Sequence, residues 1–199
     1  MNFQPGRSSG LKPPLFSHDV EQKRRPMKKL IIITIVIIGV IATLSMKGRQ
    51  INNPLPANVT ADKVLIEKSK RRLTLLNKNT QLKTYEISLG KEPIGKKTEE
   101  GDGRTPEGAY SIDRRKLKSS YHRALHLSYP NQEDSAQAKA RGVSPGGDIM
   151  IHGLPNGIGF IGKLQTKRDW TLGCIAVTNP EIEEIWRVVP DGTTVEILH

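Results

Sequence analysis

A single cysteine, Cys174, is the residue of this 199-residue chain best suited to covalent chemistry. It lies in the segment Trp170–Val177, and the pair His152-Gly153 begins 22 residues upstream of it. A lone thiol cannot form an internal disulfide, so it is either buried and inert or kept free for a reaction. We predict that Cys174 is a nucleophile and that His152 is its general base.

The residues around this pair suit acyl transfer. A cysteine that attacks an acyl group needs a base to accept its proton and donors for the developing oxyanion. Histidine is a suitable base because its ordinary pKa lies near physiological pH. Both residues follow apolar stretches and adjoin glycine, so we expect them at neighbouring strand ends, where Gly173 would let backbone N–H groups approach a carbonyl. The alternative is an inert buried cysteine beside a hydrogen-bonded structural histidine.

The elements that must position this pair indicate a mainly β domain with short helices. Alternating apolar residues from Val64 to Leu75, followed by a turn at 77–80, predict an antiparallel meander. Most of the later connections also resemble hairpins. The remaining predicted elements are strands at 109–112, 124–129, 148–151 and 193–198, and helices at 131–141 and 180–189.

Composition divides the chain into four parts. Residues 1–29 are polar, basic and proline-containing, which predicts a disordered cytoplasmic tail. Residues 30–46 carry no charge and would cover roughly 25 Å as a helix, near the short end of what spans a bilayer. Residues 47–60 are typical of a linker. Residues 61–199 form the predicted catalytic domain.

The apolar segment at 30–46 predicts one N-terminal transmembrane helix, because a buried core helix would keep a polar face. Seven basic residues precede it and only Lys47 and Arg49 closely follow it. This asymmetry predicts the N-terminus in the cytoplasm and the domain on the other side of the membrane. Met27-Lys28-Lys29 before the apolar run also fits a signal peptide, but no clear cleavage site follows, which favours an uncleaved anchor.

Charge and residue spacing argue against two other classes of protein. The net charge is +11, but residues 1–50 contribute +7 and the other 149 residues only +4. The basicity therefore lies beside the predicted membrane segment, where it would contact anionic lipid, and no nucleic-acid binding is expected. His122 and His126 have neither a second cysteine nor a suitably spaced acid to complete a zinc site, so no metal or cofactor is predicted.

Four motifs follow one another along the predicted domain. They are GDGRTPEG at 101–108, LSYPN at 127–131, GGDIMIHG at 146–153 and WTLGC at 170–174. Together they resemble the L,D-transpeptidase catalytic domain of the YkuD type, over roughly residues 61–198. A His-Gly block followed about twenty residues later by a [Ser/Thr]-x-Gly-Cys block is the signature of that family. The resemblance implies the family's mixed β-sheet fold with short helices.

The resemblance also implies roles for individual residues. Cys174 is the nucleophile and His152 the base, while Gly173 and the Cys174 N–H contribute the oxyanion site. Thr171 and Gly153 support the motif, and a backbone carbonyl can orient the histidine in place of an aspartate. The implied substrate is a peptidoglycan stem peptide. Its diaminopimelate carbonyl would form a thioester with the cysteine, release D-alanine, and pass to an amine.

Two positions depart from the commonest family pattern. Leu172 replaces a second histidine before Gly-Cys, and Ala176 replaces an arginine or asparagine two residues after the cysteine. These changes resemble a divergent Gram-negative branch that includes an enzyme releasing lipoprotein from peptidoglycan. The acceptor therefore stays open between a stem amine, an envelope lipoprotein lysine and water, which would make the protein a hydrolase. In such a cell the domain would lie in the periplasm, anchored to the inner membrane, or released if the segment is cleaved.

Three further residues are candidate contacts for a stem carboxylate or glycan: Arg123, Tyr129 and Trp170. The alternatives are core packing for the two aromatic residues and a solvated charge for the arginine. A sortase-like transpeptidase is a rival function, although Thr171 to Cys174 lacks one residue of a Thr-Leu-x-x-Cys order. The other rival is a membrane-tethered, non-catalytic wall-binding module.

Overall fold

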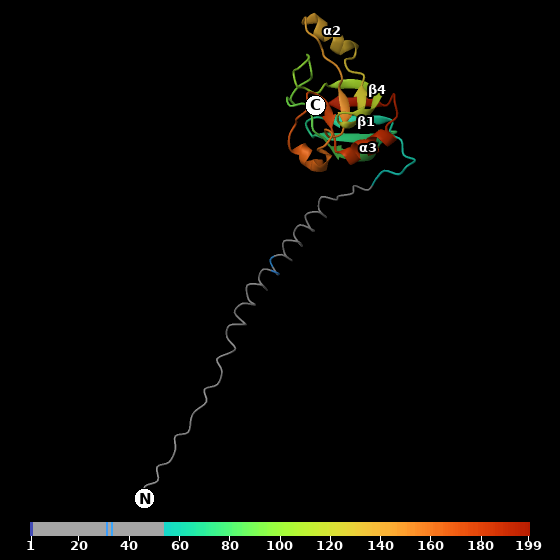
Figure 1. The fold of residues 1–199 in the computed structure, drawn as a ribbon. Helices are drawn as coiled ribbons and strands as arrows, with labels where there is room; N and C mark the ends of the chain where they lie inside the picture. The colour runs from blue at the N-terminus through green and yellow to red at the C-terminus, as the bar shows by residue number, and fades with distance from the viewer. Residues whose placement is uncertain (2–30, 32, 34–53) are drawn as a thin grey trace. The chain divides into compact units, whose positions relative to one another are not determined.

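The computed structural model describes Met1, Ile31, Ile33 and residues 54–199 (Figure 1). The chain divides into two compact units, Met1–Asn53 and Pro54–His199. The fold described below is that of the second unit.

Several sequence predictions concern the first unit. Apart from Met1, Ile31 and Ile33, the predicted tail at 1–29 and the apolar segment at 30–46 lie outside the described residues, as does the linker up to residue 53. Among the described residues, no helix is both long and apolar enough to cross a bilayer. The transmembrane helix and the location of the domain therefore stay predictions from the sequence.

A mixed eight-stranded sheet forms the centre of residues 54–199. Its order is β3-β2-β1-β8-β4-β5-β6-β7, and short helices accompany it, so the predicted mainly β fold with short helices is confirmed. In chain order, the strands are β1 (Lys63–Glu67), β2 (Arg72–Asn77), β3 (Thr80–Glu86), β4 (Gly108–Ser119), β5 (His122–Leu127), β6 (Met150–His152), β7 (Ile175–Ala176) and β8 (Thr194–Leu198).

The first three strands form the predicted antiparallel meander. Alternation buries one side of β1 and β2, including Val64 and Leu75, because alternate side chains point to the same face of a sheet. Lys78 and Asn79 close the next hairpin with φ of 46° and 62°. Two adjacent residues with positive φ match the type I′ turn, whose twist suits two antiparallel strands.

Strand β8 lies between β1 and β4, in the middle of the sheet. It pairs in parallel with β1 and antiparallel with β4, and it buries Val195 and Ile197 in the core. The sequence predicts this strand but suggests mostly hairpin connections, which do not produce this order. The alternation of side chains shows which face of a strand is buried but not which strand becomes its neighbour.

Strand β4 is much longer than the predicted strand at 109–112. Its second half is largely polar and partly exposed, and it continues past the core as an irregular ladder with β5. Strand β5 correspondingly begins at His122 rather than at residue 124. This extension carries the turn between the two strands, at Ser120 and Tyr121, out to the region of the candidate site.

Three short helical segments accompany the sheet: α2 (Gln132–Ala140), α3 (Asn179–Val188) and the 3₁₀ segment η1 (Gly159–Lys167). Capping boxes formed by Asn131 with Asp134 and by Thr178 with Glu181 begin α2 and α3, both close to the predicted positions. In Figure 1, α2 projects from the end of the sheet, whereas α3 lies along it and buries apolar residues in the core. The segment η1 was not predicted.

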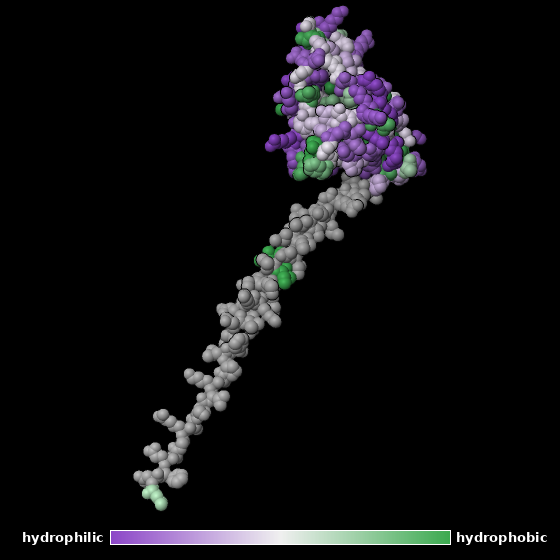
Figure 2. Space-filling model, viewed as in Figure 1, coloured by the Kyte–Doolittle hydropathy of each residue, from purple (hydrophilic) through white to green (hydrophobic). Residues whose placement is uncertain are grey.

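Apolar residues of the second unit gather mainly inside it. The buried cluster unites side chains from β1, β2, β4, β5, β8 and α3. On the face shown in Figure 2, hydrophilic residues cover most of residues 54–199 and apolar ones form only small areas. This distribution agrees with burial of apolar surface as the main stabilising contribution to the fold.

Candidate active site

Adjacent parallel strands bring Cys174 and His152 to one face of the sheet. In the β6–β7 pair, Ile151 lies opposite Ile175, and His152 lies opposite Ala176. Continuing this register by one residue places Cys174 opposite Met150, which precedes the histidine by two positions. Since side chains alternate along a strand, the thiol and the imidazole share a face and lie diagonally across the pair.

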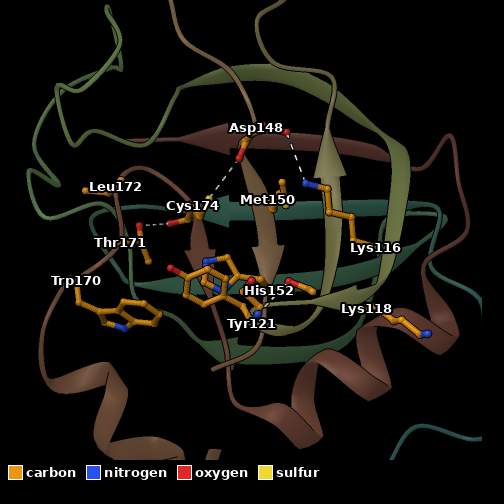
Figure 3. A pocket seen from close by; sticks show the side chains of 12 residues that line it. Lys116, Lys118, Tyr121, Asp148, Met150, His152, Trp170, Thr171, Leu172 and Cys174 are labelled. Carbon is orange, nitrogen blue, oxygen red and sulfur yellow. Dashed lines mark hydrogen bonds and ion pairs between the residues drawn. The ribbon is translucent and has the colours of Figure 1, made fainter. Parts of the chain in front are cut away.

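Both side chains line one pocket with a volume of about 570 Å³ (Figure 3). Its wall also includes Thr171 and Trp170 from the cysteine loop, Lys116 from β4 and Tyr121 from the turn after β4. The thiol therefore opens onto a groove instead of being enclosed by apolar packing. A peptide could approach the sulfur and the imidazole from the same side.

Thr171 shapes the loop that carries the cysteine. Its hydroxyl donates a hydrogen bond to the Cys174 carbonyl at 2.7 Å and accepts one from the Gly173 N–H at 3.1 Å. The predicted oxyanion contribution of the Gly173 N–H is therefore not available in this arrangement, because that group is already bound. The Cys174 N–H donates no hydrogen bond within the described residues and remains the candidate donor for an oxyanion.

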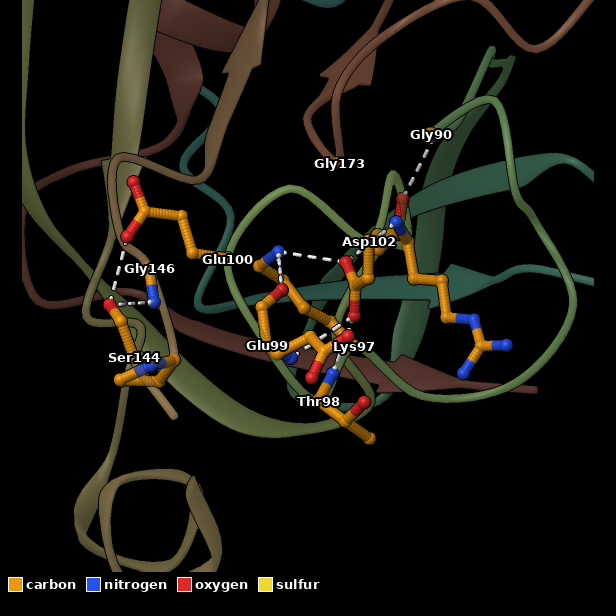
Figure 4. A network of polar contacts seen from close by, with 12 residues as sticks. Gly90, Lys97, Thr98, Glu99, Glu100, Asp102, Ser144, Gly146 and Gly173 are labelled. Atoms are coloured by element: carbon orange, nitrogen blue, oxygen red, sulfur yellow. Dashed lines mark hydrogen bonds and ion pairs between the residues drawn. The ribbon is translucent and has the colours of Figure 1, made fainter. Parts of the chain in front are cut away.

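Glycines allow three backbone segments to meet behind this loop (Figure 4). Gly173 has φ of 133°, and a Cβ atom there would lie 2.6 Å from the Arg104 carbonyl oxygen. A Cβ atom on Gly90 would lie 2.1 Å from the Gly103 oxygen and 3.1 Å from the Gly173 Cα. Such contacts are too short for any larger residue, so these glycines set the position of the cysteine loop.

Hydrogen bonds within the polar stretch at 91–107 stabilise the backbone on which the cysteine loop packs. Asp102 accepts hydrogen bonds from Lys97 Nζ at 2.9 Å, from the Thr98 N–H at 2.8 Å and from the Arg104 N–H at 3.0 Å (Figure 4). These donors hold the pKa of Asp102 below its ordinary value even though burial opposes the shift. A charged carboxylate thereby organises the loop on which Gly173 packs.

His152 has the tautomer expected of a general base. Its Nδ1 lies 2.7 Å from the Gly153 carbonyl oxygen, and because a carbonyl can only accept, Nδ1 carries the proton. The basic lone pair is then on Nε2. Burial lowers the pKa of His152 to about 4, despite the opposing effect of the bond to Gly153, so the ring is neutral at physiological pH.

Cys174 rests as a thiol. Burial raises its pKa above the ordinary value, the nearby Asp148 charge adds to this shift, and a backbone hydrogen bond from Met150 and the charges of Lys116 and Lys97 oppose it. The S–H group donates to the Asp148 carbonyl oxygen at 3.5 Å. With a neutral thiol and a neutral imidazole, the arrangement suits proton transfer during attack and not a preformed thiolate–imidazolium pair.

Two aromatic rings flank the imidazole. The Tyr121 ring lies 4.5 Å from the His152 ring between centroids, and Trp170 meets the same ring edge-on at 5.8 Å. Asn156 holds the Tyr121 turn by accepting from the His122 N–H at 3.0 Å and donating to the Ser119 carbonyl at 2.9 Å. Sequence reasoning missed Tyr121, because no local pattern shows that this turn folds over the histidine.

Tyr121→Ala is expected to raise the pKa of His152 from about 4 towards its ordinary 6.5, because the replacement admits water to the ring. Histidine accepts a proton only when it is neutral, so the acid limb of Cys174 acylation should move to higher pH. An NMR titration of the His152 ring measures the pKa directly. Leu117→Ala, at a 59% exposed position on β4 outside the pocket lining, is the control. An unchanged pKa in the Tyr121 variant would contradict this role.

The three residues predicted to contact substrate occupy different environments in the structure. Trp170 lines the pocket, whereas Arg123 and Tyr129 do not. Arg123 pairs with Glu183 at 2.9 Å and lies over the Trp186 ring, because its side chain is directed towards α3. Tyr129 is 4% exposed and donates its hydroxyl to the Pro145 carbonyl, so it is a core residue. Of the three predicted substrate contacts, only Trp170 therefore lies on the pocket wall.

Gly153 has a packing role beside the base. A Cβ atom at this position would lie 2.8 Å from Asn179 Oδ1 and 3.1 Å from the Tyr121 carbonyl oxygen. The absence of a side chain thus allows the tyrosine turn and the start of α3 to approach His152. Within the described residues, no group of three His, Cys, Asp or Glu side chains is arranged to hold a metal ion.

The fold and the site define a mainly β domain that presents one thiol and one neutral imidazole on the wall of an open pocket. The sequence model of the YkuD family, the L,D-transpeptidase catalytic domain, matches residues 61–197. The chain belongs to this family. Such membership does not favour the sortase-like alternative.

Individual relatives match part of the chain. YafK of Escherichia coli K12 is 34% identical over 110 residues, which cover 54% of this chain and 37% of YafK. The crystal structure of Pgp2, titled a helical cell shape determining protein, from Campylobacter jejuni, has 30% identity and a TM-score of 0.51, covering 70% of this chain and 48% of Pgp2. Bd1075 of Bdellovibrio bacteriovorus shares the fold at 22% identity and a TM-score of 0.51, covering 73% of this chain and 50% of Bd1075. The chain spans about half or less of each of these proteins.

Proposed function

We propose that this protein is a peptidoglycan-modifying cysteine acyltransferase of the L,D-transpeptidase type. The observation that carries the proposal is the shared pocket of Cys174 and His152, in which Nδ1 is protonated and Nε2 is left as the base. The proposed acyl donor is a peptidoglycan stem peptide, attacked at the carbonyl of its diaminopimelate residue. Membership of the YkuD family supports this substrate class.

The proposed acylation step uses groups that the pocket supplies. As the Cys174 sulfur attacks the carbonyl carbon, its proton moves to His152 Nε2 and a C–S bond forms. The Cys174 N–H stabilises the oxyanion, which collapses with cleavage of the C–N bond. His152 gives its proton to the leaving amine, proposed to be D-alanine, and a thioester remains on Cys174.

The second step returns the free thiol. His152 accepts a proton from an acceptor amine that attacks the thioester, and the sulfur leaves and is reprotonated. An amine of a second stem would give a crosslink, and a lysine of an envelope lipoprotein would give a protein attachment. Attack by water would release a carboxylate and make the protein a hydrolase. Leu172 lies on the pocket wall and is 74% exposed, so it is positioned to contact the acceptor.

Mass spectrometry of the full chain tests the proposal. Incubation with a disaccharide tetrapeptide should add the muropeptide less D-alanine to one site, Cys174. Protein previously alkylated with iodoacetamide is the matched control and should gain nothing. If the unmodified protein forms no adduct and leaves the muropeptide intact, the proposal fails and the non-catalytic wall-binding alternative gains support.

The products identify the acceptor. A muropeptide dimer joined between two diaminopimelate residues supports transfer to a stem. Attachment of a lysine-bearing lipoprotein peptide supports transfer to protein, whereas a free tripeptide muropeptide supports hydrolysis. The proposed substrates lie outside the cytoplasmic membrane, which agrees with the anchor predicted at 30–46. Digestion of the domain by protease added after removal of the outer membrane, with the cytoplasmic membrane intact, tests that location.

A further inference from the structure

A cluster of charges lies beside the nucleophile and takes no part in the proton transfers described above. It centres on Asp148, which lies two residues before β6, the strand that ends at His152. The backbone carbonyl of Asp148 accepts the Cys174 S–H, while its side chain extends outward and is 71% exposed (Figure 3). The residue whose backbone contacts the Cys174 thiol therefore also carries a carboxylate.

Two cationic side chains and a histidine ring lie near one oxygen of this carboxylate. Asp148 Oδ1 lies 3.3 Å from an Arg114 guanidinium nitrogen, 3.8 Å from Lys116 Nζ and 3.5 Å from His126 Nε2. Arg114 and Lys116 are two residues apart on β4. Lys118 follows on the same strand, lines the same pocket and forms no ion pair within the described residues. The β4 side of the pocket therefore carries more positive than negative charge.

These ion pairs differ from those that maintain the fold. Lys68 is 1% exposed and reaches Glu107 at 2.7 Å, and Lys97 with Asp102 is similarly enclosed. The Arg114 and Lys116 side chains are instead 55% and 40% exposed, and their contacts with Asp148 are longer. Exposed pairs of this kind add little to stability, so a ligand can replace the aspartate at small cost.

We propose that Arg114 and Lys116 form a binding site for a carboxylate of the acyl donor, and that Asp148 occupies this site when no donor is bound. The site would select donors that carry a free carboxylate near the scissile carbonyl. It would also place that carbonyl beside Cys174, because the same residue, Asp148, contacts both the cations and the thiol. This inference rests on the proposed function only for the identity of the donor.

Alkylation of Cys174 tests the site without any acyl transfer. The probes are iodoacetate, which carries a carboxylate, and iodoacetamide, its neutral analogue, and the measured quantity is the ratio of their rates in the full chain at low salt. Lys116→Gln should lower this ratio by about two- to fivefold, the range that an exposed charge interaction supports. Asp148→Asn should raise it by a similar factor, because the cations lose their internal partner.

Matched controls separate local from general charge effects. Lys139→Gln on α2 removes the same charge from an exposed position outside the pocket lining and should leave the ratio unchanged. Added salt should bring the ratio for the wild-type protein close to that of Lys116→Gln, since salt screens exposed charges. The iodoacetamide rate corrects for any change in the reactivity of the thiol. If both pocket variants keep the wild-type ratio, or if Lys139→Gln changes it equally, the proposal is wrong.

A second comparison addresses the donor itself. Two muropeptides that differ only in amidation of the free diaminopimelate carboxyl should acylate the wild-type protein at different rates, with the free acid faster. Lys116→Gln should reduce this difference. Equal rates in the wild-type protein would overturn assignment of the site to the donor carboxylate. If neither muropeptide reacts, the proposed function fails, and the alkylation ratios still decide the presence of an anion site.

Discussion

Replacement of Cys174 with serine is expected to abolish acylation of the protein by a muropeptide. A serine hydroxyl is far less acidic than a thiol, and a base whose pKa is about 4 would have to accept its proton. Loss of the nucleophile should lower the acylation rate by about 10³-fold or more. Intact-protein mass spectrometry measures the adduct directly.

The same serine variant also serves as a test of folding. Serine is close to cysteine in size, and Cys174 lines an open pocket instead of filling the core. Its free energy of unfolding should therefore change by no more than about 1 kcal/mol. A folded serine variant that still gains the adduct would place the reaction at another residue and refute the assignment of the nucleophile.

Replacement of His152 with glutamine is expected to slow acylation about 10²- to 10⁴-fold, the usual contribution of a general base. Glutamine retains an N–H donor for the Gly153 carbonyl but offers no basic nitrogen to the thiol. The variant should depend on spontaneous ionisation of Cys174, whose pKa is raised by burial. Its rate should therefore keep rising with pH across the alkaline range.

The wild-type protein should instead lose activity only at low pH. His152 is neutral above its pKa of about 4 and becomes protonated below it, so acylation should fall only as the pH decreases through about 4. Rates measured between pH 3 and 10 (about the range in which these groups titrate) distinguish the two proteins. A glutamine variant with the wild-type rate and pH profile would show that another group accepts the proton.

The sequence predicts that Cys174 and His152 lie at neighbouring strand ends, because each adjoins glycine and follows an apolar stretch. In the structure His152 ends β6 and Cys174 directly precedes β7, and these two strands lie side by side, which places both residues on one pocket wall. Alternation also predicts the first hairpins, where neighbours in sequence are neighbours in the sheet. For the hairpins, local sequence patterns are therefore enough to predict which strands pair.

Contacts between distant segments could not be predicted in the same way. Tyr121 reaches His152 because β4 and β5 extend beyond the core, and polar residues in that extension give no burial pattern. Arg123 was predicted as a substrate contact, and in the structure it pairs with Glu183 and lies over the Trp186 ring of α3. The choice between two such partners depends on how a helix packs on the sheet, which periodicity does not encode.

The central place of β8 has a consequence for how the molecule is made. This strand, at 194–198, joins β1 on one side to β4 on the other, so the two halves of the sheet have no direct ladder with each other. During synthesis, residues 194–198 are added after all of the other strands have been made. The eight-stranded sheet can therefore be completed only after residues 194–198 have been synthesised.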